Sequence, residues 1–276
     1  MIKHRFSLLL VGSFLAVATY AQKMTSNNYG KLVVGQNEEK VIAEDSVYID
    51  TLILKDGAKI NFRKQAILVV ENAFVGNGCE LNSGGSNGLD GDDLEQLNGG
   101  NGEDGNALTV MISFRTLGNL TINTSGGKGG KGSRGHAGDN GPAGIGGDDG
   151  KTGGNGGDGG VGGKLTLLYR SDGFLPVFNG NLNQRAWKNP EPRAKRFAAN
   201  DHSIQLNYAG GKAGAGGSGG RGGRGGEEVS HHEPVDGGKR SIKIIDSPRG
   251  RDGRTGKEGS SGSVGKDGEL ILKRID

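Results

Sequence analysis

Few residues in this sequence have side chains whose type and spacing could do chemistry. The tripeptide His231-His232-Glu233 has imidazole and carboxylate groups of the kind that bind zinc. A zinc site would also need a further ligand at a suitable spacing and a helix to present the set, and the neighbouring sequence has neither. We therefore expect a loop here and no bound metal.

Acidic turns could bind a hard cation through their carboxylate oxygens. The segment 99–104, Gly-Gly-Asn-Gly-Glu-Asp, approaches a calcium-binding nonapeptide, but Asn106 stands where an apolar residue belongs and the motif occurs once. We expect solvated turn carboxylates with at most weak calcium binding. The aspartates concerned are Asp90, Asp92, Asp93, Asp148 and Asp149.

Three glycine-rich motifs suggest phosphate or nucleic-acid binding. Residues 127–132, Gly-Lys-Gly-Gly-Lys-Gly, match the dinucleotide fingerprint, but that site needs a helix N-terminus and a glycine repeat cannot supply one. The segment 150–152, Gly-Lys-Thr, lacks the first glycine of a P-loop, because Ile145 stands there. The segment 221–226 looks like an RNA-binding RGG repeat. We expect no catalytic residue, no cofactor-binding residue, no metal ligand and no enzymatic activity.

The most regular feature is a glycine at every third position from Gly126 to Gly162, in thirteen consecutive triplets. A helix repeats every 3.6 residues and a strand every two, so neither explains this period. The extended left-handed helix of the polyproline-II type has three residues per turn, so this chain has one edge made only of glycine. Such an edge allows another backbone to lie against it.

Three structures are compatible with this period. In the first, one chain folds back as a bundle of polyglycine-II legs, two to four of them in the long run. Triplets with a single glycine near the middle of the run would then lie on an outer leg or turn. The second is a collagen triple helix, but the long run contains only one proline, Pro142. The third is a flexible linker. We favour the bundle, because the period is strict and both ends of the run join strands.

The elements that must hold these runs are short β-strands. Apolar stretches closed by turns fall within residues 46–82, and no helical pattern occurs there. One unit then occurs three times: a strand, an asparagine, a small residue, two glycines, a long glycine run and a second strand. The asparagines are Asn82, Asn123 and Asn207. We predict an all-β fold, a short-strand β-solenoid or sandwich framework with Gly-x-y excursions of polyglycine-II or collagen-like type.

The N-terminus has the pattern of a secretory signal, with a basic start, about a dozen apolar residues and small residues before Gln22. Removing Lys3 and Arg5 with the signal lowers the net charge from +3 to +1, which gives no electrostatic case for nucleic acid or a membrane. Cys79 is the only cysteine, so no intrachain disulfide can form.

The sequence predicts five segments. Residues 171–203 contain the only tryptophan, Trp187, and a basic cluster, and we expect an irregular exposed loop there. The segments are a signal peptide (1–21), an N-terminal β-strand region (22–83), a β framework with two glycine-rich excursions (84–170), the irregular loop (171–203), and a third excursion with a C-terminal strand (204–276).

The glycine runs, which cover about residues 84–270, resemble the bundles of the snow flea antifreeze protein, of some phage tail adhesin tips and of the Obg GTPase N-terminal domain. They also resemble segments of bacterial collagen-like surface proteins. This resemblance implies a secreted glycine-rich repeat protein. The outward residues here are mostly Lys, Asp, Asn, Arg and Ser, whereas ice-binding bundles present a flat apolar face.

These observations predict a non-enzymatic structural or adhesive protein, secreted to the extracellular space or cell surface, with the periplasm as a further location. We expect a monomer rather than a homotrimer, no membrane span, no nucleic acid, and a partner in the extracellular matrix or among surface glycans and proteins. One alternative function is a collagen-like trimeric stalk. Another is a carbohydrate-binding β-helix protein, in which Trp187 would contact the glycan.

Overall fold

The computed structural model describes residues 26–92, 98–180, 202–235 and 240–275, and every regular element in these ranges is a strand. This confirms the predicted all-β class. The first sheet contains, in spatial order, β1 (Ser26–Val34), β3 (Ser46–Leu54), β5 (Ala66–Val75), β7 (Leu108–Leu117), β9 (Leu165–Ser171) and β14 (Leu270–Arg274). The second contains β10 (Val177–Gly180), β11 (Ser203–Asn207), β8 (Asn119–Asn123), β6 (Cys79–Asn82), β4 (Lys59–Phe62) and β2 (Glu39–Ile42).

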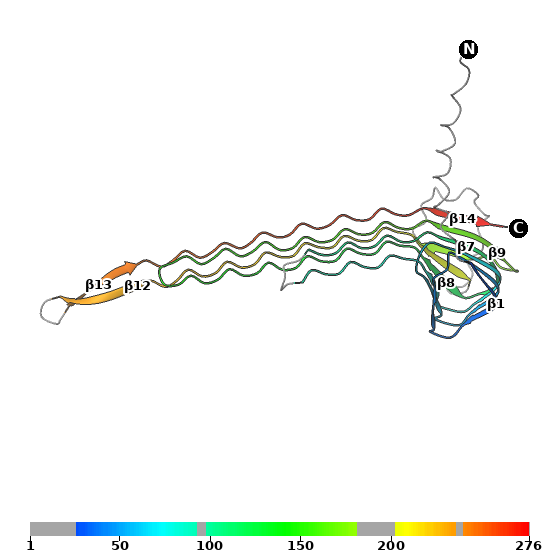
Figure 1. The fold of residues 1–276 in the computed structure, drawn as a ribbon, viewed down its shortest axis with the longest axis horizontal. Coiled ribbons are helices and arrows are strands. Elements are labelled where there is room, and N and C mark those ends of the chain that lie inside the picture. Colours follow the sequence, from blue (N-terminus) through cyan, green and yellow to red (C-terminus); the bar gives the residue numbers. More distant parts are fainter. Residues whose placement is uncertain (1–25, 93–97, 181–201, 236–239, 276) are drawn as a thin grey trace, which may run out of the picture.

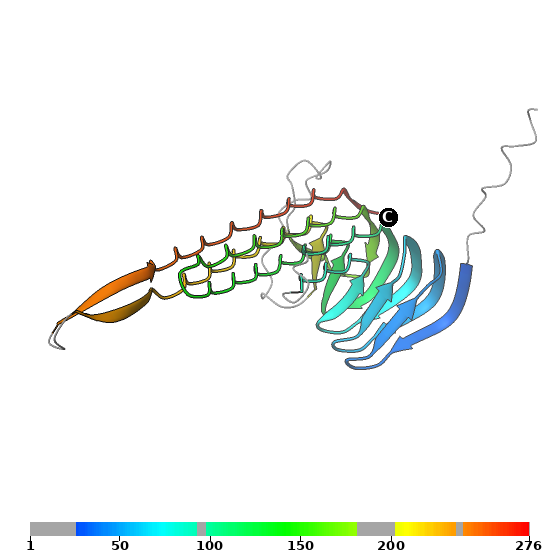
Figure 2. The ribbon, with the colours of Figure 1, turned by 60° about the vertical axis from the view of Figure 1, so that its left-hand side comes forward.

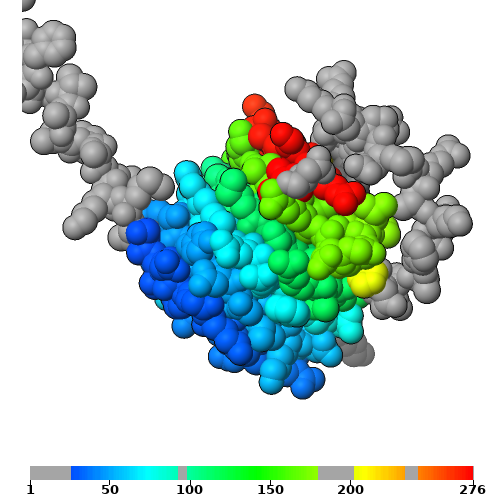
Figure 3. Space-filling view, turned by 90° about the vertical axis from the view of Figure 1, so that its right-hand side faces the viewer, coloured from blue at the N-terminus to red at the C-terminus, as the bar shows by residue number. Residues whose placement is uncertain are grey.

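From β1 to β10 the chain alternates between the two sheets, β11 follows β10 in the second sheet, and neighbours in each sheet pair in parallel. Partner residues in β1 and β3 are 20 positions apart in sequence, and those in β3 and β5 are 21 apart. The separation then rises to 42 for β5 and β7, 57 for β7 and β9, and 105 for β9 and β14. The glycine runs are therefore inserted between strands while the pairing of the framework continues. The space-filling view shows the successive coils stacked from blue to red (Figure 3).

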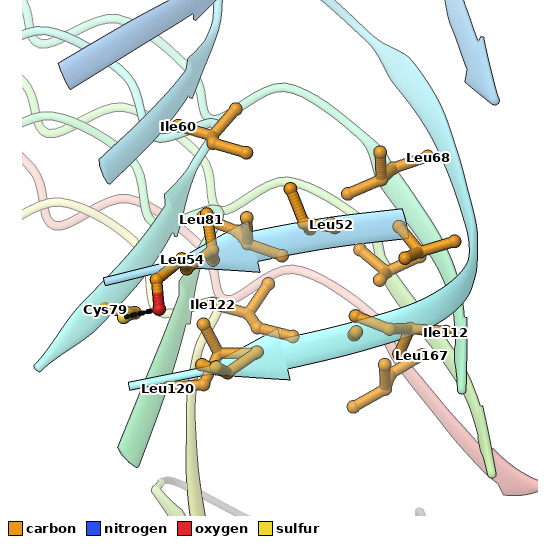
Figure 4. Packing of buried hydrophobic residues seen from close by; sticks show 14 of the residues in the cluster. Leu52, Leu54, Ile60, Leu68, Cys79, Leu81, Ile112, Leu120, Ile122 and Leu167 are labelled. Carbon is orange, nitrogen blue, oxygen red and sulfur yellow. Dashed lines mark hydrogen bonds between the residues drawn. The ribbon is translucent and has the colours of Figure 1, made fainter. Parts of the chain in front are cut away.

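The core lies between the two sheets. Buried residues alternate along the central strands, as a period of two requires; in β3 they are Val47 and Ile49, then Leu52 and Leu54. Leu52 and Leu68 of the first sheet lie close to Leu81 and Ile122 of the second (Figure 4). Burial of these aliphatic side chains, at about 1.5–3 kcal/mol each, is the main stabilising contribution to the framework.

The turns between coils repeat the same backbone conformation. Asn37, Gly57 and Gly78 have positive φ values of 55°, 72° and 66° and lie in three successive turns. The Asn37 amide donates to the Asp56 carbonyl at 3.0 Å, and the Gly57 amide donates to that of Asn77 at 2.8 Å. Glycine and asparagine adopt this left-handed conformation more readily than other residues, which explains their presence at these three positions.

Glycine-rich extended segments, here called legs, leave this body and return in pairs (Figure 1). Legs 1 and 2 connect β6 to β7, legs 3 and 4 connect β8 to β9, and legs 5 and 6 connect β11 to β14. Their ranges are 84–92, 98–107, 124–143, 146–164, 208–228 and 248–269. The last pair carries at its far end the antiparallel hairpin of β12 (Val229–Val235) and β13 (Arg240–Ser247) (Figure 2).

The legs form two layers. Legs 1, 3 and 5, which lead away from the sheets, form the outgoing layer, and legs 2, 4 and 6, which lead back, form the other. In the outgoing layer, the Gly88 amide of leg 1 donates to Lys128 of leg 3 at 2.7 Å, and Gly129 of leg 3 donates to Lys212 of leg 5 at 2.8 Å. Legs 2, 4 and 6 are bonded in the same way. The Gly157 amide of leg 4 donates to the Gly130 carbonyl of leg 3 at 2.9 Å, so hydrogen bonds also join the two layers.

Several elements differ from the expectation. β10 lies within the segment expected to be an irregular loop, where it pairs with β11, whereas β1 and β2 lie within the expected N-terminal β-strand region 22–83. The loop expected at His231-His232-Glu233 is instead part of β12, because these residues pair in antiparallel with β13. The expected strand at Ser241–Ile245 is confirmed as part of β13. The signal segment and Trp187 lie outside the described residues.

Candidate functional site

An asparagine ladder joins the second sheet to the legs. The Asn82 side-chain amide donates to the Asn61 side-chain oxygen at 3.0 Å, and Asn123 donates to Asn82 at 2.9 Å. The side-chain oxygen of Asn82 also accepts the Gly84 backbone amide, and that of Asn123 accepts the Ser125 backbone amide, both at 3.1 Å. The ladder thus fixes the point at which a strand ends and a leg begins. The repeated strand-Asn-small-Gly-Gly unit located these residues in the sequence, but not their mutual contacts.

The number of glycines per triplet follows the number of neighbouring legs. Leg 3 near its base has legs on both sides and in the other layer, and its triplets carry two glycines. A Cβ on Gly126 would lie less than 3.0 Å from the Gly160 carbonyl oxygen of leg 4. A Cβ on Gly127 would lie less than 3.0 Å from the Ser86 carbonyl oxygen of leg 1. Beyond residue 134, where legs 1 and 2 have ended, leg 3 has the single-glycine triplets Gly-His-Ala, Gly-Asp-Asn and Gly-Pro-Ala.

Acidic and amide side chains on the legs serve as backbone acceptors. The Asp90 carboxylate accepts the Lys131 amide at 2.7 Å, while the next residue, Gly91, donates its amide to the Lys131 carbonyl at 2.7 Å. The backbone N–H and C=O of Lys131 are thereby both hydrogen-bonded to one Asx-Gly pair on the neighbouring parallel leg. The same pair of hydrogen bonds is made by the Asx-Gly pairs that begin at Asn87, Asp90, Asn98, Asn101, Asp104, Asn140, Asp149, Asn155 and Asp158.

This arrangement separates the aspartates considered for calcium. Asp90 and Asp149 each bind a backbone amide of a different leg, and Asp148 is exposed. The described residues contain no group of three or more His, Cys, Asp or Glu side chains that could hold a metal ion. Asp93 lies outside the described residues. The sequence signal for the Asx-Gly role is the dipeptide itself, repeated in register with the glycine period.

The phosphate-type motifs lie on the legs as well. Residues 127–132 belong to leg 3 and 150–152 to leg 4, and in both the glycine amides donate to carbonyls of neighbouring legs. The Gly129 and Gly130 amides, for example, bind Lys212 and Gly100. These amides are therefore not available to a phosphate. Arg221 and Arg224 lie on leg 5 with exposed side chains.

The hairpin at the far end of legs 5 and 6 holds His231, whose environment raises its pKa. His231 Nδ1 lies 2.8 Å from Asp246 and its Nε2 lies 3.4 Å from Glu233. The hydrogen bond to Asp246, with that carboxylate's charge, raises the pKa of His231 above its ordinary value. Lys243 pairs with Glu228 across the strands, and Ile242 and Ile245 are exposed. These groups could make ionic and apolar contacts with a partner.

We expect the His231 pKa, measured by an NMR titration, to lie above about 6.5, the value of an isolated imidazole. Asp246→Asn should bring it back toward that value, and Glu233→Gln should lower it less. Because the folded-state pKa is raised, this pairing stabilises the hairpin at low pH and is lost as the pH rises through the folded-state value. An unchanged titration in Asp246→Asn would contradict the assignment.

Cys79 is buried against the Lys55 and Leu54 carbonyls, with its Sγ 3.3 Å and 3.8 Å from their oxygens (Figure 4). Burial raises the pKa of this thiol, which suits the expected packing role rather than a reactive one. The basic cluster near residues 190–197, considered as a binding surface, lies outside the described residues. So does the whole hairpin turn at 236–239.

The described residues contain no helix long and apolar enough to cross a membrane. No family model matches the chain, and no curated protein matches it. Among solved structures, it is similar to the nine-helix polyproline type II bundle antifreeze protein of the springtail Granisotoma rainieri, with 23% identity over 68% of this chain and 95% of that chain. The TM-score of this superposition is 0.15, which does not show a shared fold.

Proposed function

We propose that this chain is a non-enzymatic structural or adhesive protein of the cell surface or extracellular space. In this proposal a β-solenoid base carries a rod of polyglycine-II legs, all formed by one molecule. The observation that carries the proposal is the bonding of glycine amides at every third residue to carbonyls of neighbouring legs. In an ordered rod of this kind the backbone N–H and C=O groups are hydrogen-bonded to one another, so they offer no binding site to a substrate.

The register supports the solenoid base. Successive strands of each sheet are displaced by 20 or 21 residues before the first excursion, which is one coil per repeat. The three-residue spacing of the interleg bonds supports polyglycine-II legs, because that helix has three residues per turn. Each outgoing leg continues directly from a strand of the second sheet, β6, β8 or β11, so the sheet fixes where the legs begin.

The length of the rod supports a role in reaching or spacing. Leg 5 has 21 residues, and at about 3.1 Å per residue it extends about 65 Å. The hairpin is placed at the far end of this leg, away from the base (Figure 1). Legs 3 and 4, in contrast, reverse in a tight turn in which Ile145 donates to the Pro142 carbonyl at 2.9 Å. The hairpin is therefore not needed for chain reversal, which suggests a contact function at the tip.

This turn supplies a matched test. We would replace residues 229–247 with the Pro142–Ile145 turn, so that legs 5 and 6 reverse as legs 3 and 4 do. Cells that display the intact chain should attach to a matrix-coated surface, and cells that display the hairpin-less chain should attach several-fold less at equal surface amounts. Equal attachment of both cell types, or no attachment by either, would refute the adhesive role.

A further inference from the structure

The net positive charge of the rod is concentrated on one face. Near the base of leg 3, the first residue of a triplet faces leg 4 and the second faces leg 1, as the positions of a Cβ on Gly126 and on Gly127 show, respectively. The third residue, such as Lys128, is exposed and lies on the outer side of the outgoing layer. The same order holds on leg 5, where Gly210 faces leg 6 and Gly211 faces leg 3, which leaves Lys212 outward.

We call the outward side of legs 1, 3 and 5 the basic face. Its third-position side chains include six cations and two acids, Asp90 and Glu227. The Asp90 carboxylate is already bound to a backbone amide. The cations are Lys128, Lys131 and Arg134 on leg 3, and Lys212, Arg221 and Arg224 on leg 5.

The opposite side, made by legs 2, 4 and 6, is nearly balanced. Its five cations are accompanied by four acids: Glu269, which pairs with Lys164, and Asp104, Asp149 and Asp158, which accept backbone amides of the next leg. The cations there are Lys164, Arg251, Arg254, Lys257 and Lys266. The two faces of one rod therefore carry a similar number of cations but very different net charge.

The cations of the basic face are available to a ligand. Within the described ranges, Lys128, Lys131 and Lys212 form no ion pair, and neither do Arg221 and Arg224. Arg134 has an interaction of its own within the protein. Like charges held together on a rigid surface repel one another, and an anionic ligand that neutralises several at once relieves this repulsion and releases its counterions.

We propose that the basic face binds a linear acidic polysaccharide, with a carboxylate or sulfate on its repeating units. Successive cations on one leg, such as Lys128 and Lys131, are three residues apart, which is about 9 Å at a rise of 3.1 Å per residue. A straight row of cations at a constant interval complements an extended polymer with anions at regular intervals. The arginines can bind carboxylate or sulfate oxygens in a bidentate manner. This inference rests on the proposed extracellular role of the rod.

The composition of the face favours a glycan over a nucleic acid. Single-stranded nucleic acids are bound by aromatic side chains on which the bases stack. The described third-position residues of the basic face are Lys, Arg, Ala, Ser, Asn, Asp and Glu, and none is aromatic. The face therefore offers a ligand mainly its cations, which suit a polymer with negative charge along its length.

The test uses two full-chain variants that lose the same charge. One is K128Q/K131Q/R221Q/R224Q on the basic face, and the matched control is R251Q/R254Q/K257Q/K266Q on the opposite side. Both are assayed on immobilised heparin and polygalacturonate, with neutral amylose and duplex DNA as further probes, at low salt and at about 0.15 M. We expect the wild-type chain to bind both acidic polysaccharides and not amylose. The basic-face variant should bind at least about tenfold more weakly, since it loses four contacts, and the control should change less than about threefold.

Three results would overturn the inference: no retention on either acidic polysaccharide at low salt, equal losses in the two variants, or tighter binding to DNA than to the polysaccharides. Amide exchange of the legs is measured on the same samples. Protected legs together with a failed glycan assay would refute the polysaccharide ligand alone, whereas unprotected legs would refute the rod.

Discussion

Gly157→Ala is expected to lower the free energy of unfolding by about 3 kcal/mol, the upper end of the overpacking range. Gly157 lies on leg 4, and its amide and carbonyl are both bonded to other legs, to Gly130 and Gly214, each at 2.9 Å. A methyl group there would fall well inside 3.0 Å of the Gly100 carbonyl oxygen of leg 2. That neighbour is backbone rather than a flexible side chain, so legs 2 and 4 must separate. The change is measured by urea unfolding and by amide exchange at Gly99 and Gly102.

Gly30→Ala is the matched control, because the same methyl group on β1 would meet nothing closer than Asp50 Oδ2 at 3.9 Å. We expect it to be neutral or to stabilise the chain by up to about 1 kcal/mol through the lower entropy of the unfolded state. Similar effects of the two substitutions would mean that legs 2 and 4 are not packed as described.

Asn123→Ala is expected to cost about 2 kcal/mol, because it removes a donor to Asn82 and an acceptor for the Ser125 amide at one position. The loss falls where β8 becomes leg 3, so amides at the base of that leg should exchange faster. Asn179→Ala on β10 is the control: this exposed side chain has no hydrogen bond within the described part of the chain, and its removal should change stability by less than about 0.5 kcal/mol. If Asn123→Ala proves no worse than Asn179→Ala, the ladder does not hold the leg in place.

The sequence allowed the all-β class to be predicted because its two periods are physically distinct. The alternation of Val47 with Ile49, and of Leu52 with Leu54, indicates strands, and the period of three between Gly126 and Gly162 can belong to neither strand nor helix. The single-glycine triplets of leg 3 were predicted to lie at an outer leg or turn, and they begin where legs 1 and 2 end. Local chemistry decides these features, so one sequence is sufficient to predict them.

Other features depend on pairing between residues distant in sequence. β12 has a sequence, Val-Ser-His-His-Glu-Pro-Val, with little strand character of its own, and it forms a strand because β13 lies beside it. Asn82 and Asn123 are 41 residues apart, and Asp149 and Arg254 are 105 apart. Their contacts follow from the register of the paired strands. Because the inserted legs differ in length, this register does not correspond to a fixed repeat length in the sequence.

Net charge describes the whole chain and not one face of it. The formal value of +1 expected after removal of the signal gave no electrostatic case for nucleic acid or a membrane. The fold places Lys128, Lys212 and Arg221 on one layer while the acids of other triplets bind backbone amides. A strict repeat can therefore produce a strongly charged face within a nearly neutral chain, since every third residue points the same way.

Amide hydrogen exchange of the full chain, resolved for residues 126–162, tests most directly whether the glycine legs pack within one molecule. We expect the amides of Gly129, Gly130, Gly156 and Gly157, each bonded to another leg, to be strongly protected, with protection independent of protein concentration. Exchange of these four amides at the rate of an unstructured peptide would show that the legs do not pack. Protection that vanished on dilution would place the packing between chains instead.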